Sequence, residues 1–405
     1  MRQSNKKKKW IKFRHRVVRN IVYAVLYPYS RLKYGITIEK FKEQQDCPYL
    51  ILYNHQTAFD QFFVGMAFRD PVYYLASEDI FSLGFLSSVI KYLVAPIPIK
   101  KQTTDVKAIL NCIRVAQEGG TIAIAPEGNR TYSGKTEYIN PAIVPLIRKL
   151  GLPIALYRLE GGYGVQPRWS DVVRRGKMRG CVSRVITPEE YKALTDDELT
   201  AAVNEELFVN EAKADAEFRH KCLAEYLERA VYVCPYCGLS SFESSKNIIE
   251  CKKCGKKIEY LPTKRLRGIG FDFPFEFVSD WYDYQKDFVN RLELDEMDDS
   301  PLYEEKAAMS EVIVYEKKLP LYGEADIFLY KDRIKIKTPD TTYDFPFNEA
   351  SAVTVLGKNK LNIYHDKKVY QLKGSERFNA LKYVNLYNRY KNIAKGEGHG
   401  EFLGL

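Results

Sequence analysis

The chain has 405 residues and a formal net charge of +10, and this charge is unevenly distributed. Residues 1–38 contain eleven Lys and Arg side chains and no Asp or Glu, so the other 367 residues carry 51 basic and 52 acidic side chains. No apolar segment reaches the ~20 residues of a membrane-spanning helix, which excludes a protein held by transmembrane helices. We also expect no signal peptide, because Pro28 interrupts the first apolar stretch and no small-residue cleavage site follows it.

The basic arm, residues 1–38, has the pattern of an amphipathic helix. One half of its helical wheel carries Trp10, Ile11, Phe13, Val17, Val18, Ile21, Ala24 and Val25. The other half carries Lys12, His15, Arg16, Arg19 and Asn20. Basic arms bind nucleic acid or anionic lipid, and an apolar half beside the charges favours a helix lying in a membrane interface. We therefore expect an anionic membrane surface as partner, no nucleic acid, and a peripheral or monotopic location on the cytoplasmic face. An ordinary helix packed on its own domain is the alternative.

Residues 39–230 alternate short apolar strands with helical segments. The strands are predicted at 49–53, 72–76, 95–99, 121–125 and 153–159. One helix is predicted to begin at Thr103 or Thr104, with Asp105 in its first turn, and to end at Glu118-Gly119-Gly120. Thr187 and Thr195 are each predicted to cap the start of a helix, and acidic helical sequence continues from there to about Arg229. Alternation of this kind predicts an α/β domain with a mostly parallel sheet and flanking helices.

His55 and Asp60 follow the first of these strands. An imidazole at a strand end can take a proton from an alcohol, and a carboxylate five residues later can fix its tautomer and stabilise the imidazolium. The pair is the base-and-orienter half of a catalytic triad in which the substrate supplies the hydroxyl. The alternative is that the two side chains do not contact each other. For an isolated pair at this spacing, that alternative is the commoner one.

A second group of polar residues follows the strand at 121–125. Glu127, Gly128, Asn129 and Arg130 lie in a loop, where glycine lets backbone approach a ligand and arginine suits a phosphate. Between the two groups, the apolar strand at 95–99 ends in two cations, Lys100 and Lys101. After them comes a further apolar strand that opens at Pro153.

This order of blocks resembles the glycerophosphate and lysophospholipid acyltransferase family, over residues 17–190. Members carry His-x4-Asp, an apolar strand ending in a basic residue, Glu-Gly-Thr-Arg, and an apolar segment with a proline. His55 and Asp60 match the first block, and Glu127, Gly128 and Arg130 match the third. The departures are Asn129 for threonine, Ala95 for glycine, Pro98 for an aromatic residue and Lys101 for arginine.

The resemblance implies transfer of a fatty acyl group from acyl-CoA or acyl-carrier protein to a lysophospholipid, by default 1-acyl-glycerol-3-phosphate. His55 would be the general base and Asp60 its orienter, with no catalytic metal. Arg130, with Lys100 or Lys101, would hold the acceptor phosphate, and Glu127 would orient the loop. Another lysophospholipid or an amino-lipid is an alternative acceptor. A non-catalytic membrane adaptor is the alternative from another class.

Four of the eight cysteines mark a second module at residues 231–262. Cys234 and Cys237 form one Cys-x-x-Cys-Gly turn, and Cys251 and Cys254 form another. Two such knuckles supply four thiolates for a closed tetrahedral site, which predicts a structural zinc in a ribbon-like module. Two disulfides or a redox dithiol are the alternative. The role of this module in the protein is left open.

The last part of the chain is rich in strands. After a linker predicted at 263–310, hairpins are predicted at 325–338 and 360–372, and a helix from about Ser375 to Ala394 closes a domain at 311–396. Residues 397–405 form a tail. Strand hairpins followed by one terminal helix resemble a pleckstrin-homology-like fold by shape alone, and this domain is a candidate for binding a protein partner.

Overall fold

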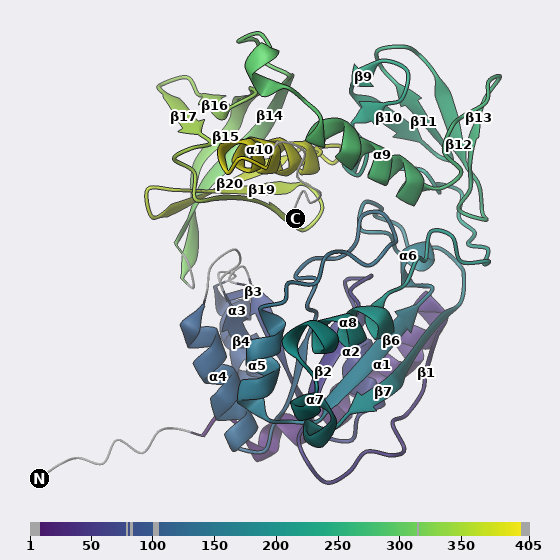
Figure 1. The fold of residues 1–405 in the computed structure, drawn as a ribbon, viewed down its shortest axis with the longest axis vertical. Coiled ribbons are helices and arrows are strands. Elements are labelled where there is room, and N and C mark those ends of the chain that lie inside the picture. The colour runs from purple at the N-terminus through teal and green to yellow at the C-terminus, as the bar shows by residue number, and fades with distance from the viewer. Residues whose placement is uncertain (1–8, 78–79, 82–83, 100–104, 314–315, 398–405) are drawn as a thin grey trace, which may run out of the picture. The chain divides into compact units, whose positions relative to one another are not determined.

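The computed structural model describes residues 9–77, 80–81, 84–99, 105–313 and 316–397. The chain divides into two compact units (Figure 1). Unit 1 comprises Met1–Arg130, Thr136–Gly162 and Lys177–Val209. Unit 2 comprises Thr131–Lys135, Tyr163–Gly176 and Asn210–Leu405. Two short stretches from the first half of the chain therefore belong to the unit that is formed mainly by the second half.

Unit 1 is built on one seven-stranded sheet with the order β1-β7-β6-β2-β5-β3-β4. Its strands are β1 (Ile36–Ile38), β2 (Leu50–Tyr53), β3 (Val72–Ser77), β4 (Ile97–Ile99), β5 (Thr121–Ile124), β6 (Ile154–Glu160) and β7 (Met178–Ile186). Neighbouring strands run parallel except β6 and β7, which are antiparallel. Residues 50–53 and 121–124 are buried throughout, as strands covered on both faces of a parallel sheet require. The predicted α/β fold is confirmed.

The helices of unit 1 follow the strands in chain order. They are α1 (Phe13–Tyr34), α2 (Asp60–Ala67), α3 (Phe85–Leu93), α4 (Val106–Gln117), α5 (Ile143–Leu150), α7 (Pro188–Ala193) and α8 (Asp196–Leu207). Asp105 is the N-cap of α4 and not a first-turn residue, because its side chain accepts the N–H of Ala108 at 3.0 Å. Thr103 and Thr104 lie outside the described residues. Both predicted capping boxes, at Thr187 and Thr195, are present.

The predicted helical run to residue 229 is wrong beyond Leu207. The backbone becomes extended at Phe208. The N–H of Thr136 then donates to the carbonyl of Val209 at 2.9 Å. The Thr136 hydroxyl also donates to the carbonyl of Leu207 at 3.1 Å. These bonds take carbonyl groups that a continuing helix would use, so the helix ends. Only a short 3-10 turn, Leu227–Arg229, follows before residue 230.

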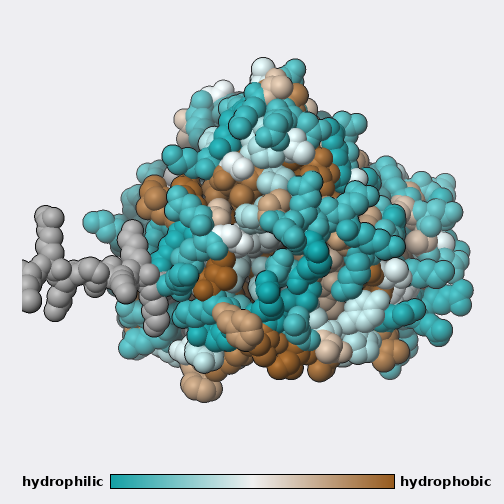
Figure 2. Space-filling model, turned by 90° about the horizontal axis from the view of Figure 1, so that it is seen from below, coloured by the Kyte–Doolittle hydropathy of each residue, from teal (hydrophilic) through white to brown (hydrophobic). Residues whose placement is uncertain are grey.

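Helix α1 packs one side on unit 1 and exposes the other. His15, Ser30 and Tyr34 are buried, and the Nδ1 atom of His15 lies 3.0 Å from the Tyr73 hydroxyl. The prediction placed His15 on the polar half of the helical wheel, but this partner allows it to be buried. The outward side carries large apolar residues spaced by one or two helical turns: Phe13, Val17, Ile21, Val25 and Leu32. On the face drawn in Figure 2, hydrophobic side chains form separate patches among hydrophilic ones.

No helix in the described part of the chain is both long enough and apolar enough to cross a membrane.

The first part of unit 2 contains the four cysteines. A two-stranded sheet joins β8 (Val233–Cys234) to β9 (Gly238–Leu239). A four-stranded antiparallel sheet joins β10 (Phe242–Ser245), β11 (Ile248–Cys251), β12 (Lys257–Tyr260) and β13 (Leu266–Gly268) in that order. Residues 263–310, predicted as a linker, are structured, since they contain β13, α9 (Val278–Asn290) and part of β14. Trp281 of α9 is fully buried against Phe242 and Phe273.

The second part of unit 2 is a seven-stranded antiparallel sheet with the order β17-β16-β15-β14-β20-β19-β18. Its strands are β14 (Tyr303–Ile313), β15 (Lys317–Leu329), β16 (Arg333–Lys337), β17 (Thr342–Pro346), β18 (Ala352–Leu356), β19 (Lys360–His365) and β20 (Lys368–Gly374). Both predicted hairpins are present, as β15–β16 and β19–β20. Helix α10 (Leu381–Ala394) starts six residues later than predicted, because the Asn379 side chain accepts the N–H of Leu381 at 2.8 Å.

Candidate active site

His55 and Asp60 meet at the point where β2 gives way to α2. The Nδ1 atom of His55 lies 2.8 Å from the Oδ2 atom of Asp60, whose side chain is fully buried. The same carboxylate accepts the N–H of Gln56 at 2.6 Å, the N–H of Thr57 at 2.9 Å, and the hydroxyl of Thr57 at 2.6 Å. Asp60 is also the first residue of α2, where a negative charge is favourable. The carboxylate is thus fixed by its own loop and helix, and it fixes one ring nitrogen of His55.

The loop that carries His55 is tied to the neighbouring strand β6. Asn54 donates from its amide nitrogen to the carbonyl of Leu159 at 2.8 Å, and its amide oxygen accepts the N–H of Leu159 at 2.7 Å. Gln56 donates to the same carbonyl at 3.1 Å. Two buried amide side chains, one on each side of His55, therefore hold the loop against one backbone position of β6.

Glu127 joins the second motif to the first. One carboxylate oxygen accepts the backbone N–H of His55 at 2.7 Å, and the other accepts the N–H of Glu137 at 2.8 Å. Burial raises the pKa of Glu127 to about 8, against the effect of these two N–H donors, which lower it. Since both oxygens are engaged with backbone, Glu127 supports the loops and is not placed as a second base.

The rest of the second motif, Gly128, Asn129 and Arg130, follows Glu127 directly in the chain. Gly128 has φ +70°, a left-handed conformation that glycine adopts without strain, and Asn129 is buried. The charges of Asp60 and Arg130 both act on the hydroxyl of Tyr34. Burial raises the pKa of Tyr34 to about 12, with Asp60 adding to the rise and Arg130 opposing it. Arg130 and Asp60 thus act in opposite directions on one group, the Tyr34 hydroxyl.

A comparison with protein-family models matches residues 36–156 to the family described as Acyltransferase. Residues 36–156 form an acyltransferase domain. Both motifs lie inside this domain, so the membership predicted from them is confirmed for that segment. Among solved structures, the chain is similar to the 1-acyl-sn-glycerophosphate (LPA) acyltransferase PlsC from Thermotoga maritima, at 20% identity and a TM-score of 0.39, over 46% of this chain and 77% of that chain. A search of curated proteins found no match.

The second block of the acyltransferase domain is described only in part. Lys100 and Lys101 lie outside the described residues, so their place relative to His55 stays a prediction. Ala95, where the family resemblance has glycine, has φ +42°. A side chain in this left-handed region costs on the order of 1 kcal/mol, which accounts for the usual glycine. Its carbonyl accepts the indole N–H of Trp10 at 2.9 Å.

Several supporting residues of the acyltransferase site were missed in the sequence. Asn54 lies directly before His55 and Thr57 lies between His55 and Asp60, and their amide and hydroxyl groups were the available signal. The backbone N–H of Glu137 and both backbone groups of Leu159 had no signal, because any residue type supplies them. Tyr34 was also missed, since it lies at the end of the amphipathic helix.

Four of the six cysteines outside the acyltransferase domain, Cys234, Cys237, Cys251 and Cys254, form one cluster. Their sulfur atoms all lie within 4.8 Å of one another, with Cys234–Cys254 at 3.8 Å and Cys237–Cys251 at 3.6 Å. Gly238 and Gly255, which follow the two knuckles, have φ +73° and +71°. A tetrahedral zinc with Zn–S bonds of ~2.3 Å requires sulfurs about 3.8 Å apart, so the donor set fits this metal. None of these cysteines is in a disulfide.

Proposed function

We propose that the protein is a membrane-associated O-acyltransferase that moves a fatty acyl group from an acyl thioester to a lysophospholipid. The observation that carries the proposal is the His55–Asp60 pair inside the acyltransferase domain, with Nδ1 of His55 on a buried carboxylate. An Nδ1–H that donates to Asp60 leaves Nε2 as the basic nitrogen. This is the protonation state that a general base needs.

The reaction would run as a single exchange of oxygen for sulfur at the acyl carbon. The hydroxyl oxygen of the acceptor attacks the thioester carbonyl while its proton passes to Nε2 of His55. The tetrahedral oxyanion then collapses, the C–S bond breaks, and the imidazolium returns the proton to the departing thiolate. Asp60 stabilises the imidazolium between these steps. The N–H groups of His55, Gln56 and Thr57 already donate to carboxylates, so other donors would stabilise the oxyanion.

The acceptor is proposed to be 1-acyl-glycerol-3-phosphate, and the donor acyl-CoA or acyl-carrier protein. Arg130 supports a phosphate-bearing acceptor, since it lies three residues after Glu127, which binds the N–H of His55, and its guanidinium offers paired donors for phosphate oxygens. Lys100 and Lys101 are proposed to assist Arg130.

Association with an anionic membrane surface is proposed to use helix α1. Its outward side combines the large apolar residues Phe13, Val17, Ile21, Val25 and Leu32 with nearby cations. Phe13 is 82% exposed and Leu32 is 88% exposed. Apolar side chains would enter the interface while Arg14, Arg16, Arg31 and Lys33 meet lipid phosphates. We propose the cytoplasmic face of the membrane as the location of this surface.

The substrates can be tested with purified full-length protein, a labelled acyl-CoA or acyl-carrier protein, and a panel of lysolipids. The expected result is transfer to 1-acyl-glycerol-3-phosphate in preference to lysolipids without an exposed phosphate monoester. Arg130→Ala should raise the KM for this acceptor more than the KM for the thioester. An equal effect on both substrates would remove Arg130 from the acceptor site, and transfer to a neutral lysolipid alone would replace the acceptor.

A further inference from the structure

Both loops of the proposed active site run directly into unit 2. The first exit follows Arg130, since Thr131–Lys135 belong to unit 2 and the chain returns to unit 1 at Thr136. The N–H of Glu137, immediately after this return, donates to Glu127 at 2.8 Å. Glu127 in turn accepts the N–H of His55. Arg130 therefore lies directly before a five-residue segment that belongs to unit 2. Glu137, which binds Glu127, lies two residues after the same segment.

This five-residue segment is firmly anchored within unit 2. Tyr132 is fully buried in the unit 2 core, and the guanidinium of Arg168 lies 4.3 Å from the centre of its ring. The carbonyl of Gly134 accepts the N–H of Glu211 at 2.8 Å. The Nζ atom of Lys135 lies 2.7 and 2.6 Å from the two carboxylate oxygens of Asp283 on α9. Core burial, a backbone bond and an ion pair thus fix three consecutive parts of the segment.

The second exit follows strand β6, three residues after the position that holds the His55 loop. Leu159 binds Asn54 and Gln56, and Gly162 packs so closely on Gln56 that an added Cβ would lie 2.5 Å from its side-chain oxygen. Helix α6 (Gly162–Val165) then carries the chain into unit 2 for Tyr163–Gly176. The segment that leaves unit 1 and the segment that re-enters it lie close together, because a Cβ on Gly161 would lie 2.2 Å from the carbonyl oxygen of Lys177.

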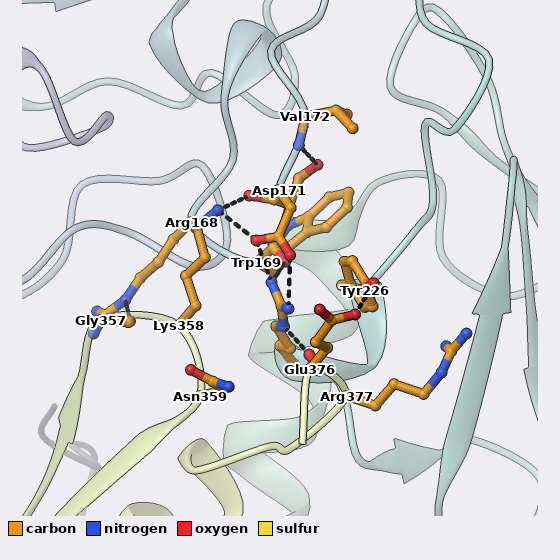
Figure 3. A network of polar contacts seen from close by, with 12 residues as sticks. Arg168, Trp169, Asp171, Val172, Tyr226, Gly357, Lys358, Asn359, Glu376 and Arg377 are labelled. Carbon is orange, nitrogen blue, oxygen red and sulfur yellow. Dashed lines mark hydrogen bonds and ion pairs between the residues drawn. The ribbon is translucent and has the colours of Figure 1, made fainter. Parts of the chain in front are cut away.

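The excursion 163–176 is anchored in unit 2 by buried arginines and by the network in Figure 3. Arg174 is fully buried, and its guanidinium lies 4.9 Å from the ring centres of both Trp169 and Tyr260. Asp171 accepts two hydrogen bonds from the buried Arg229, at 2.9 and 3.0 Å, and one from Lys358 at 2.5 Å. Lys358 belongs to the turn between β18 and β19, so the excursion is fixed to the C-terminal sheet.

We propose that unit 2 is a positioning module for the acyl-transfer site, and that Tyr132, Lys135 and Asp283 are positioning residues. The proposal rests on the proposed acyltransferase function. The coupling runs through the chain itself, because segments anchored in unit 2 begin or end within a few residues of Arg130, Glu137 and Leu159. The cysteine cluster and the C-terminal sheet would then be needed for a correctly held His55 and Arg130, which a merely appended module would not be.

The Lys135–Asp283 ion pair allows a test that leaves the motif residues intact. Asp283→Lys places an ammonium opposite Lys135, and Lys135→Glu places a carboxylate opposite Asp283. The double variant Lys135→Glu/Asp283→Lys restores opposite charges at the same positions. Lys213→Glu is the matched control, since Lys213 pairs with Asp280 of the same helix at 2.7 Å and adjoins no motif. All four proteins are prepared as full-length chains.

Hydrogen exchange of the His55 and Glu137 amides is measured first, because both amides report on Glu127 without any substrate. Asp283→Lys and Lys135→Glu should each raise their exchange rates about fivefold, as expected for the loss of roughly 1 kcal/mol at a partly exposed pair. The charge swap should restore the slow rates, and Lys213→Glu should leave them unchanged. The kcat for acyl transfer should fall in Asp283→Lys and in Lys135→Glu, recover in the charge swap and stay unchanged in Lys213→Glu. The KM for the thioester should stay constant in all of them.

Equal exchange rates in Asp283→Lys and Lys213→Glu would overturn the proposal, because the effect would then be general to unit 2. Unchanged rates in every variant would overturn it as well. If the wild-type protein shows no acyl transfer, the proposed function fails, but the exchange rates still decide whether unit 2 positions these loops.

Discussion

His55 and Asp60 are joined by a hydrogen bond of 2.8 Å, and the same carboxylate closes the turn between them through the N–H groups of Gln56 and Thr57. Asp60 therefore has two roles at one position. It ends the loop and starts helix α2, and it sets the orientation of the imidazole ring. A five-residue spacing satisfies both roles, because the loop is just long enough to fold the histidine back onto the first residue of the helix.

Replacing Asp60 by Asn should lower kcat by about 10²–10⁴, since an amide stabilises the wrong tautomer of His55 and cannot stabilise the imidazolium. Thr57→Val is the matched control. It removes the hydroxyl's hydrogen bond to Asp60 and the one that the hydroxyl accepts from the N–H of Phe59 at 3.1 Å, at a cost of about 0.5–1.5 kcal/mol each, but it leaves the His55–Asp60 bond in place. Steady-state kinetics and urea unfolding of both variants provide the comparison. A kcat for Asp60→Asn as high as that of Thr57→Val would show that Asp60 acts only on the loop.

Acidic substitutions on the outward side of α1 should release the protein from anionic vesicles. Ile21→Glu/Val25→Glu replaces two exposed apolar residues without touching the buried His15, Ser30 or Tyr34. Vesicle affinity should fall by about tenfold or more, because each lost apolar insertion is worth on the order of 1 kcal/mol. Ile248→Glu/Ile269→Glu, at exposed apolar positions of unit 2, should sediment with vesicles as wild type does. Equal loss in both pairs would assign membrane binding to net charge alone.

The purified protein should contain one zinc ion per molecule. Cys251→Ser should abolish zinc binding and open residues 231–260 to protease, since metal binding at such sites supplies about 10–16 kcal/mol of folding free energy. Cys222→Ser, outside the cluster, should keep the metal. Because unit 2 is proposed to position the active-site loops, chelation should also lower acyl transfer. Elemental analysis of protein kept reduced is the measurement, and a metal-free wild type would rule out the site.

Acid should weaken the Asp171–Arg229 network at a pH set by Asp171. Burial raises the pKa of Asp171, but hydrogen bonds from Arg229 and Lys358 outweigh it and lower the pKa to about 2. An aspartate in the unfolded chain titrates near pH ~4, so the network stabilises the fold fully above that pH and is lost as the pH falls toward 2. Asp171 is partly exposed, which limits the effect to about 1 kcal/mol.

Urea unfolding followed by tryptophan fluorescence tests this between pH 7 and pH 2. Asp171→Asn should be less stable than wild type at pH 7, and the difference should shrink below pH 4. Asp340→Asn, which makes the same charge change in an exposed loop, should show no such convergence. A constant difference between Asp171→Asn and wild type at every pH would contradict the assignment.

Local patterns carried most of what the sequence predicted. His55 and Asp60 lie five residues apart, and each cysteine pair lies within one turn, so spacing alone brought these groups together. The strands β2 and β5 were visible as short apolar runs. Capping boxes at Thr187 and Thr195 gave two helix starts, because each uses side chains only three residues apart.

Relationships across long stretches of chain were not predictable in this way. The bond from the His55 N–H to Glu127 spans 72 residues and uses a backbone group, which any residue supplies. The assignment of Thr131–Lys135 and Tyr163–Gly176 to unit 2 depends on where Tyr132 and Trp169 are buried. His15 was placed on a polar face because its partner, Tyr73, lies 58 residues away. In each case a distant partner decides the outcome.

The most direct test of acyl transfer compares wild type with His55→Ala, using the labelled thioester and the preferred lysophospholipid. Wild-type protein should produce diacyl product, and His55→Ala should lose about 10²–10⁴ in kcat while its thermal unfolding stays close to wild type, since the ring is partly exposed at the end of β2. Turnover by a folded His55→Ala variant at the wild-type rate would contradict the account.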